Sequence, residues 1–412
     1  MKNASQCIRI IILTAMILIT LSLLGCDSTD KPSVAPVNTD IPRESTLPTV
    51  TTAPETSSSK PDDMVESTNT TESEGEPESK PETEPEPETE TETETETQPD
   101  PAPHIPDGLV VVTDQKAGQE GIAVYDLSGL DLSHYDFEQE YMEIDPAQIE
   151  VFRYTEGLYD VAGVKLRTLP STGEYVLMVA YGGSYAAMIS YPKGELLWST
   201  SLAGQGPHSI ELLPEEWIVV AAPGHSANDY ADGTLTFFNP KRTQPRLSVN
   251  LPNAHGVLYD PEGNYIWAVG GDRLVKYSYV MDAGRIHVAE ELTVTLPSSG
   301  AHDLAAYYGD TDKLIVTTTE KAYVYQKSTN SFLTASEDGG IKSAKRIKGI
   351  GILQDGSVVF TRPNEVLYPV RSSWLTDCIV YHKRVDGELI KYRLVSDQYE
   401  IYKIRVMRAE YQ

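Results

Sequence analysis

The chain has 412 residues, 61 of them acidic and 33 basic, which gives a formal net charge of −28 at pH 7. So acidic a protein repels phosphate backbones, and this argues against nucleic acid as a partner. Of the three cysteines, Cys7 and Cys26 lie within or directly after an apolar leader. Cys378 is then left alone in the remainder, which excludes an internal disulfide.

Residues 1–25 predict a lipoprotein signal peptide. Lys2 and Arg9 flank the start of an apolar run, residues 10–24, that is short for a transmembrane helix. The run ends in Leu-Leu-Gly-Cys26, which resembles the bacterial lipobox. That resemblance implies acylation of Cys26, cleavage before it, and anchoring on the extracellular face of the bacterial cell membrane. The alternative is an ordinary cleaved signal with an incidental cysteine.

Residues 26–104 predict a disordered linker. From residue 27 onward the segment has no aromatic residue and is rich in Thr, Glu, Pro and Ser, with 21 acids and 4 bases. It cannot bury enough apolar surface to offset the entropy of ordering. Prolines and charge repulsion favour an extended chain of up to ~3.1 Å per residue, long enough to cross a cell wall. The alternative is a solvating tail with no spacing role.

Residues 105–412 predict an all-β domain. Short β-branched runs bounded by turn residues recur along it, and most are followed by an alternating third run and a weaker fourth. Four strands per unit is the pattern of a propeller blade. The strongest runs are Leu109–Val112, Tyr175–Val179, Trp217–Ala221, Tyr265–Val269, Lys313–Thr317 and Ser357–Thr361.

An internal repeat supports the propeller. His208, His255 and His302 are spaced 47 and 47 residues apart, and each opens an apolar run followed by a turn and a second apolar run. The chain ends in an unattached strand at residues 401–406, while the domain starts near Gly108 with a second strand. The sequence therefore predicts six blades closed by the C-terminal strand, which hides both sheet edges. Seven blades is the alternative, because residues 342–394 are long for one unit.

The repeat register places functional side chains on one rim of the channel. His208, His255 and His302 lead three consecutive blades, and three imidazoles could bind a divalent metal ion. Lysines are expected to lead the other three blades and to attract an anionic small molecule or glycan. These are Lys342, Lys403 and, with a one-residue slip, Lys165. The alternative is that each histidine only ties neighbouring blades together through backbone hydrogen bonds.

Other residues are weaker candidates. Trp374 and Arg362, with Arg371, are expected on a long insertion that forms a sugar-stacking lip or an aromatic cover over the channel. Glu211 and Asp303 could orient imidazoles. The oxygen-rich loop 224–233 lacks EF-hand spacing and is interpreted as a solvated turn. We find no nucleophile elbow, phosphate-binding loop or His-Glu-x-x-His motif.

The inner-strand phrases that begin at His208, Ala254, Ala301 and Ile341, with Tyr402-Lys403-Ile404-Arg405, resemble a family of uncharacterised secreted bacterial six-bladed propellers. The three histidines are also similar in kind to those of oligogalacturonate lyase, a propeller family that uses histidines and a divalent metal to cleave acidic pectin fragments. The sequence thus indicates a monomeric, lipid-anchored propeller that binds an anionic small molecule or glycan. The alternatives are a metal-dependent lyase acting on uronate-rich polysaccharide and a protein-interaction scaffold.

Overall fold

The computed structural model describes residues 104–202, 204–242, 244–333, 345–363 and 367–411. The predicted signal peptide, the lipidation site Cys26, the linker up to residue 103 and the candidate Lys342 lie outside the described residues and remain predictions. Within the described ranges, no helix is long and apolar enough to span a membrane.

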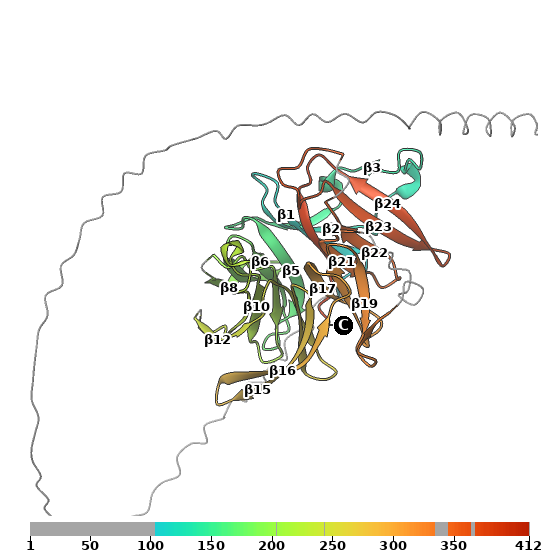
Figure 1. Cartoon of the computed structure of the whole chain (residues 1–412). Helices are drawn as coiled ribbons and strands as arrows, with labels where there is room; N and C mark the ends of the chain where they lie inside the picture. Colours follow the sequence, from blue (N-terminus) through green and yellow to red (C-terminus); the bar gives the residue numbers. More distant parts are fainter. Residues whose placement is uncertain (1–103, 203, 243, 334–344, 364–366, 412) are drawn as a thin grey trace, which may run out of the picture. The chain divides into compact units, whose positions relative to one another are not determined.

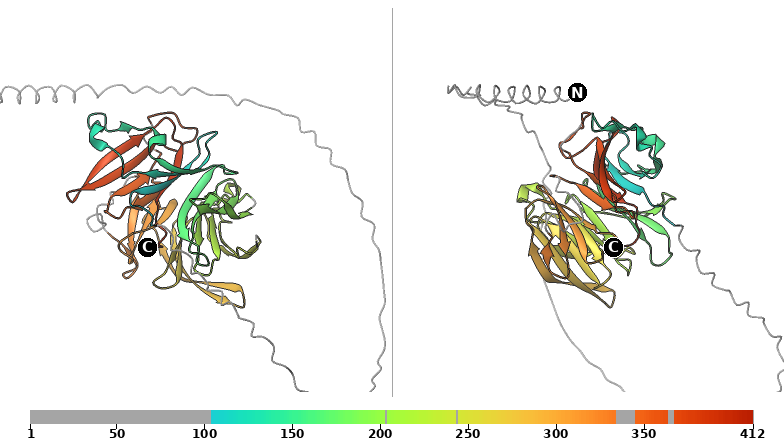
Figure 2. Two further views of the ribbon diagram at one scale, coloured as in Figure 1. Left: turned by 180° about the vertical axis from the view of Figure 1, so that it is seen from behind. Right: turned by 90° about the vertical axis from the view of Figure 1, so that its right-hand side faces the viewer.

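The described part of the chain forms six β-sheets that surround a common axis as the blades of a propeller (Figures 1 and 2). The predicted six-bladed fold is confirmed, and the seven-bladed alternative is excluded for this region.

The strands of each blade are given from the inner strand outward. Blade 1 consists of β25 (Ile401–Val406), β1 (Leu109–Asp114), β2 (Gly121–Asp126) and β4 (Glu150–Tyr154). Blade 2 consists of β5 (Val161–Thr168), β6 (Tyr175–Tyr181), β7 (Tyr185–Tyr191) and β8 (Leu196–Ser201). Blade 3 consists of β9 (Ser209–Leu212), β10 (Ile218–Ala222), β11 (Thr234–Phe238) and β12 (Pro245–Asn250), and blade 4 of β13 (Ala254–Asp260), β14 (Tyr265–Gly270), β15 (Arg273–Asp282) and β16 (Arg285–Thr295). Blade 5 consists of β17 (Ala301–Ala306), β18 (Lys313–Thr318), β19 (Ala322–Gln326) and β20 (Ser331–Phe332). Blade 6 consists of β21 (Gly349–Ile352), β22 (Val358–Thr361), β23 (Cys378–Val385), β24 (Glu388–Val395) and a fifth strand, β3 (Met142–Glu143).

The ring closes as the sequence predicts. β25 pairs antiparallel with β1, with Val110 opposite Val406, so the last strand of the chain is the inner strand of blade 1. A second link was not predicted. The segment between β2 and β4 carries β3 to blade 6, where Met142 pairs in parallel with Leu394. Strands from the N-terminal and C-terminal parts of the domain therefore pair with each other in blade 1 and again in blade 6.

Alternating side chains of β1 show why these runs form strands. Val110 and Val112 pack into a cluster shared with blade 6, and Val111 faces a cluster shared with blade 2. All three are fully buried, because a strand of a propeller blade is covered on both faces. Burial of each such side chain contributes roughly 1.5–3 kcal/mol. Short runs of valine and isoleucine satisfy this two-sided environment better than an amphipathic alternation would.

The inner strands bend where they reach one end of the channel. The ladder shifts by one residue at Ala162 in β5, at His255 in β13 and at His302 in β17. A β-bulge of this kind leaves one residue unpaired and redirects its side chain. Glycine after the bulge permits the next blade to approach. A Cβ on Gly256 would lie 2.8 Å from the backbone nitrogen of Leu304.

Candidate ligand site at the channel mouth

Six residues, one from each blade, form a ring at one end of the channel. They occupy the position where each inner strand begins, and all six line a pocket of about 340 Å³ that is called here the mouth pocket. In blade order they are Tyr402, Ala162, His208, His255, His302 and Lys348. Gln115, Asp160, Gly182, Tyr230 and Trp374 complete the lining. The three histidines thus come together from neighbouring blades, as the repeat spacing indicates.

The lysines are placed differently from the sequence expectation. Lys348, which sequence reasoning missed, precedes β21 and takes the ring position expected of Lys342. Lys403 follows the ring residue Tyr402, and Lys165 lies three residues beyond Ala162. Both of these lysines are buried within the channel and do not line the mouth pocket. One ring position is therefore an ammonium group, one is an aromatic ring and one is a methyl group.

The imidazoles are close and their orientation is fixed. The ring centroids of His208 and His255 are 4.5 Å apart, and those of His255 and His302 are 5.9 Å apart. Nδ1 of His208 lies 2.6 Å from the carbonyl oxygen of Gly206, and Nδ1 of His255 lies 2.9 Å from that of Asn253. A carbonyl only accepts, so Nδ1 carries the proton in both rings and Nε2 keeps its lone pair.

These contacts bear on the alternative in which the histidines tie adjacent blades together. The accepting carbonyl of each ring belongs to the residue two positions earlier in the same chain segment, not to the next blade. Burial, above all, lowers the pKa of His208 well below its usual range and that of His255 to about 3. Both imidazoles are therefore neutral at physiological pH, with Nε2 able to accept a hydrogen bond or to ligate a metal ion.

Lys348 is the unusual group in the ring. The residue is only 7% exposed, and its Nζ lies 3.0 Å from Nε2 of His302 and 5.9 Å from the ring centre of Tyr402. No carboxylate of the described residues forms an ion pair with it. Burial, followed by repulsion from Lys403 and Arg346, lowers the pKa of Lys348 from 10.5 to about 7. A buried ammonium group without a counter-ion is costly, so this position favours an external anion.

The two channel lysines, in contrast, each have a carboxylate partner. Nζ of Lys165 lies 3.1 Å from Glu211, whose carboxylate also accepts from Arg167 at 2.6 and 2.8 Å. Glu211 therefore holds cations within the channel wall, and the structure does not show it orienting an imidazole, as the sequence had suggested. The pKa of Lys165 falls to about 8 because burial outweighs this pairing.

Asp303 repeats the arrangement on blade 5. Its carboxylate accepts from Arg405 and lies 3.4 Å from Nζ of Lys403, which also donates to the carbonyl of His208 at 3.2 Å. Burial lowers the pKa of Lys403 to about 8. When Lys348 is included, the buried charged groups of the channel are five cations and two carboxylates. Their net positive charge is favourable for an anion in the mouth pocket. The cations are Lys165, Arg167, Lys348, Lys403 and Arg405, and the carboxylates are Glu211 and Asp303.

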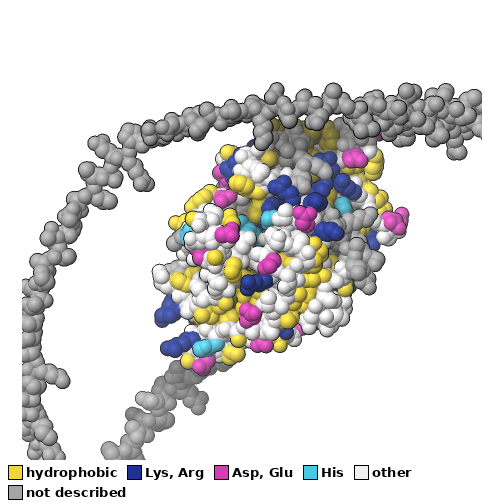
Figure 3. Space-filling view, in the orientation of Figure 1, with side chains coloured by type: hydrophobic (Ala, Val, Ile, Leu, Met, Phe, Trp, Pro, Cys, Tyr) yellow, Lys and Arg dark blue, Asp and Glu magenta, His cyan; other side chains and the backbone are white. Residues whose placement is uncertain are grey.

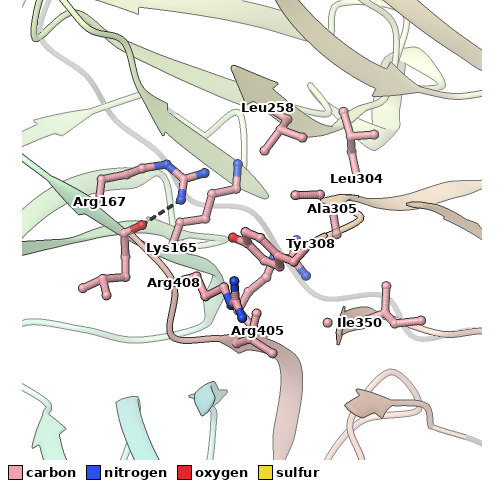
Figure 4. Close-up of a pocket in the computed structure, with 13 residues that line it drawn as sticks. Lys165, Arg167, Leu258, Leu304, Ala305, Tyr308, Ile350, Arg405 and Arg408 are labelled. Atoms are coloured by element: carbon pink, nitrogen blue, oxygen red, sulfur yellow. Dashed lines mark hydrogen bonds between the residues drawn. The ribbon is translucent and has the colours of Figure 1, made fainter. Parts of the chain in front are cut away.

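The channel beyond these ion pairs is nearly filled. Figure 4 shows Lys165, Arg167, Arg405 and Arg408 gathered around Tyr308, with Leu258 and Leu304 above them. The cavity left there has only about 20 Å³, which is space for about one water molecule. Tyr411 closes this region further, since its ring centre lies 4.7 Å from the guanidinium of Arg167. A ligand of several atoms therefore fits the mouth pocket and not this chamber.

The insertion after β22 reaches the mouth pocket. Trp374 lines it with 47% of its surface exposed, as expected of a residue at the lip. Arg371 does not face the pocket, since it pairs with Glu120 at 3.1 Å and with Glu400 at 3.2 Å and so fixes the insertion to the blade. Arg362, the other arginine predicted at the lip, is partly buried at the end of β22 and does not line the pocket.

The loop 224–233 folds as a turn held by its own side chains. Asp232 accepts from His225 at 2.6 Å and from Asn228 at 3.1 Å. This loop carries Tyr230 into the mouth pocket. Over the described ranges, no group of three or more His, Cys, Asp or Glu side chains is arranged to hold a metal ion. Cys378, the cysteine of the described residues, is free and buried.

Positive charge also gathers on the outer surface. Figure 3 shows Lys and Arg side chains collected over the part of this face where Figure 1 labels β22, β23 and β24. Lys391 on β24 is exposed and does not line the mouth pocket. Because it is a lysine of the same blade as Lys348, it serves below as a matched control for long-range charge effects.

Comparisons with known proteins name no activity. Residues 167–368 match the profile described as "Family of unknown function (DUF6528)". No curated protein matches the sequence. Among solved structures, the chain is similar to a functionally unknown protein from Desulfotomaculum acetoxidans DSM 771, with a TM-score of 0.45 and 8% identity over 74% of this chain and 100% of that chain.

Proposed function

We propose that this protein is a surface-anchored lipoprotein whose mouth pocket binds an anionic small molecule or glycan. The observation that carries the proposal is the ammonium group of Lys348, which is buried, faces the pocket and has no carboxylate partner among the described residues. Natural proteins rarely bury a lone cation without a function for it. A bound anion supplies the missing counter-charge.

The surroundings of Lys348 support the proposal. The pocket volume of about 340 Å³ is at the lower end of the range for small-molecule sites and suits one sugar residue or a molecule of similar size. Trp374 and Tyr230 offer aromatic surface at the lip, against which a sugar ring can pack. Paired cations deeper in the channel add a favourable field for an anion.

Anchoring completes the proposal. Acylation of Cys26 attaches the chain to the extracellular face of the membrane, and the acidic segment up to residue 104 separates the propeller from the lipid surface. The mouth pocket is thereby presented to extracellular solutes or to polymers of the cell surface.

The proposal is tested by calorimetric titration of the full-length protein in detergent with sodium D-glucuronate and with D-glucose. We expect glucuronate to bind and glucose not to bind at the same concentrations. Lys348→Met should weaken glucuronate binding at least tenfold, since it removes the counter-charge, and the matched control Lys391→Met should leave it unchanged. Equal effects of the two variants, or no binding of glucuronate or of any other anion tested, would contradict the proposal.

A second candidate is a metal-dependent lyase that acts on uronate-rich polysaccharide. The observation in its favour is the pair of unprotonated Nε2 atoms on His208 and His255, each fixed by the hydrogen bond of its Nδ1. Ligand histidines in metal sites are held in this way. Bound divalent metal in the purified protein, lost when all three ring histidines are replaced by alanine, would support this candidate.

A further inference from the structure

The hydrogen-bonding groups of the mouth pocket specify more than the charge of the ligand. Nε2 of His208 and Nε2 of His255 can only accept, because the proton of each ring is on Nδ1. No donor of the described residues reaches either Nε2 atom. The carboxylate of Asp160 also lines the pocket and receives no hydrogen bond from the described residues. The pocket therefore offers three unsatisfied acceptor groups.

The donor side of the pocket is concentrated at one position. Lys348 lies next to His302 in the ring, and His302 accepts from its Nζ at 3.0 Å. In a ring of six blades, His208 lies across the channel from Lys348, and His255 lies between them on one side. A ligand that fills the pocket thus meets an ammonium group at one end and hydrogen-bond acceptors along the other.

From this arrangement we infer that the ligand is a polyhydroxy carboxylate, with its carboxylate on Lys348 and hydroxyl protons donated to His208, His255 and Asp160. The inference rests on the proposed function and specifies its ligand class. Inorganic sulfate satisfies Lys348 but brings no donor for the imidazoles and is repelled by Asp160. A carboxylate without hydroxyl groups leaves all three acceptors unpaired by the ligand, and half-buried acceptors that lose contact with water and gain no donor disfavour such a ligand.

The experiment compares four compounds in titrations of the full-length protein in EDTA: sodium D-glucuronate, sodium cyclohexanecarboxylate, sodium sulfate and D-glucose. Glucuronate and cyclohexanecarboxylate share the charge and the six-membered ring and differ in their hydroxyl groups. We expect glucuronate to bind at least tenfold more tightly than cyclohexanecarboxylate and sulfate. Equal binding of the two carboxylates would overturn the inference while leaving the proposed function in place. Failure of all three anions to bind both with and without EDTA would overturn both.

Variants of His255 locate the effect. His255→Phe keeps a planar ring but removes the acceptor, so we expect it to weaken glucuronate binding about tenfold and not to weaken cyclohexanecarboxylate binding. His255→Gln restores an acceptor oxygen near the position of Nε2 and should recover part of the loss. Circular dichroism and thermal unfolding report whether each variant folds. Equal weakening of both carboxylates by His255→Phe, or glucuronate binding that needs a divalent metal and so vanishes in EDTA, would refute the assigned role of Nε2.

Discussion

Replacement of Lys348 with methionine should make the empty protein more stable while it weakens anion binding at least tenfold. Methionine has a similar length and no charge, so the change removes the buried ammonium group and little packing. The contacts that are lost are the donation from Nζ to Nε2 of His302 at 3.0 Å and the approach of Nζ to the ring of Tyr402, whose centre lies 5.9 Å away. Because His302 lines the mouth pocket, water can replace this donor.

The size of the effect follows from the pKa of Lys348, which burial lowers from 10.5 to about 7. This difference corresponds to at most about 5 kcal/mol of unfavourable free energy for the charged folded state. The sign depends on pH. Below about pH 7 the amine is charged in both states and the full cost is present. Between pH 7 and 10.5 the unfolded chain binds more protons, so wild-type stability rises with pH and the cost disappears.

The assay is thermal or chemical unfolding of the wild type, Lys348→Met and the control Lys391→Met at pH 6 and at pH 10. We expect Lys348→Met to raise the melting temperature at pH 6 by about 10 °C at most. At pH 10 its melting temperature should approach that of the wild type. The control should follow the wild type at both values. A Lys348→Met protein that is no more stable than the wild type at pH 6 would show that the ammonium group is not isolated, and would refute this reasoning.

Three further predictions follow from other parts of the chain. Replacement of Cys26 with serine should release the protein from the membrane fraction, which fractionation and detection of the acyl chain would show. Deletion of residues 27–104 should leave the melting temperature almost unchanged. Deletion of residues 399–412 should unfold the domain, because it removes β25, the inner strand of blade 1. If the protein tolerates both deletions equally, closure of the ring by β25 is contradicted. Glucuronate binding at pH 8 should take up protons, because a bound carboxylate raises the pKa of Lys348 from about 7. Titrations in buffers of different ionisation enthalpy measure this proton uptake. Its absence would contradict the contact between the ligand carboxylate and Lys348.

The pH dependence expected of the histidines changes once burial is considered. Free imidazoles titrate near pH 6.5, and the sequence alone predicts that metal-dependent binding fails toward pH 5, whereas purely anionic recognition holds or strengthens as the histidines become charged. The pKa of His255 falls to about 3 because the ring is buried beside other potential cations. It therefore stays neutral at pH 5. Lys348, not a histidine, is the group of the ring that titrates near neutrality.

The fold and the histidine cluster could be predicted from the sequence because both depend on local, repeating signals. β-branched runs mark the strands, and the 47-residue spacing places His208, His255 and His302 at equivalent positions. The split first blade follows from the unattached strand at residues 401–406. The fifth strand of blade 6 could not be predicted, since β3 has only two residues and pairs with a strand distant in sequence.

The repeat pattern alone did not identify which lysine occupies the ring position of blade 6, because that position also depends on how closely neighbouring inner strands pack. Lys342 and Lys348 both follow an isoleucine, but Gly349 comes after Lys348 just as Gly256 comes after His255. A Cβ on Gly349 would lie 2.7 Å from the backbone nitrogen of Ile404, so only glycine permits the two inner strands to approach this closely. The same signal, in Gly163, marks Ala162 and not Lys165 as the ring residue. Glycine does not follow His208, His302 or Tyr402, so this signal favours Lys348 over Lys342 without marking every ring position.

The buried lysines of the channel differ in whether they have a carboxylate partner. The lysines that maintain the fold have one, and the lysine proposed to bind a ligand does not. Lys165, Lys403 and Lys348 are all buried, and burial lowers the pKa of each. Glu211 and Asp303 neutralise the first two, and removal of either acid would leave cations unpaired. Lys348 has no such acid among the described residues and faces a pocket large enough for a ligand. In the proposed function a bound anion offsets the cost of this charge near neutral pH, so the predicted gain in stability and loss of binding on its replacement have a single cause.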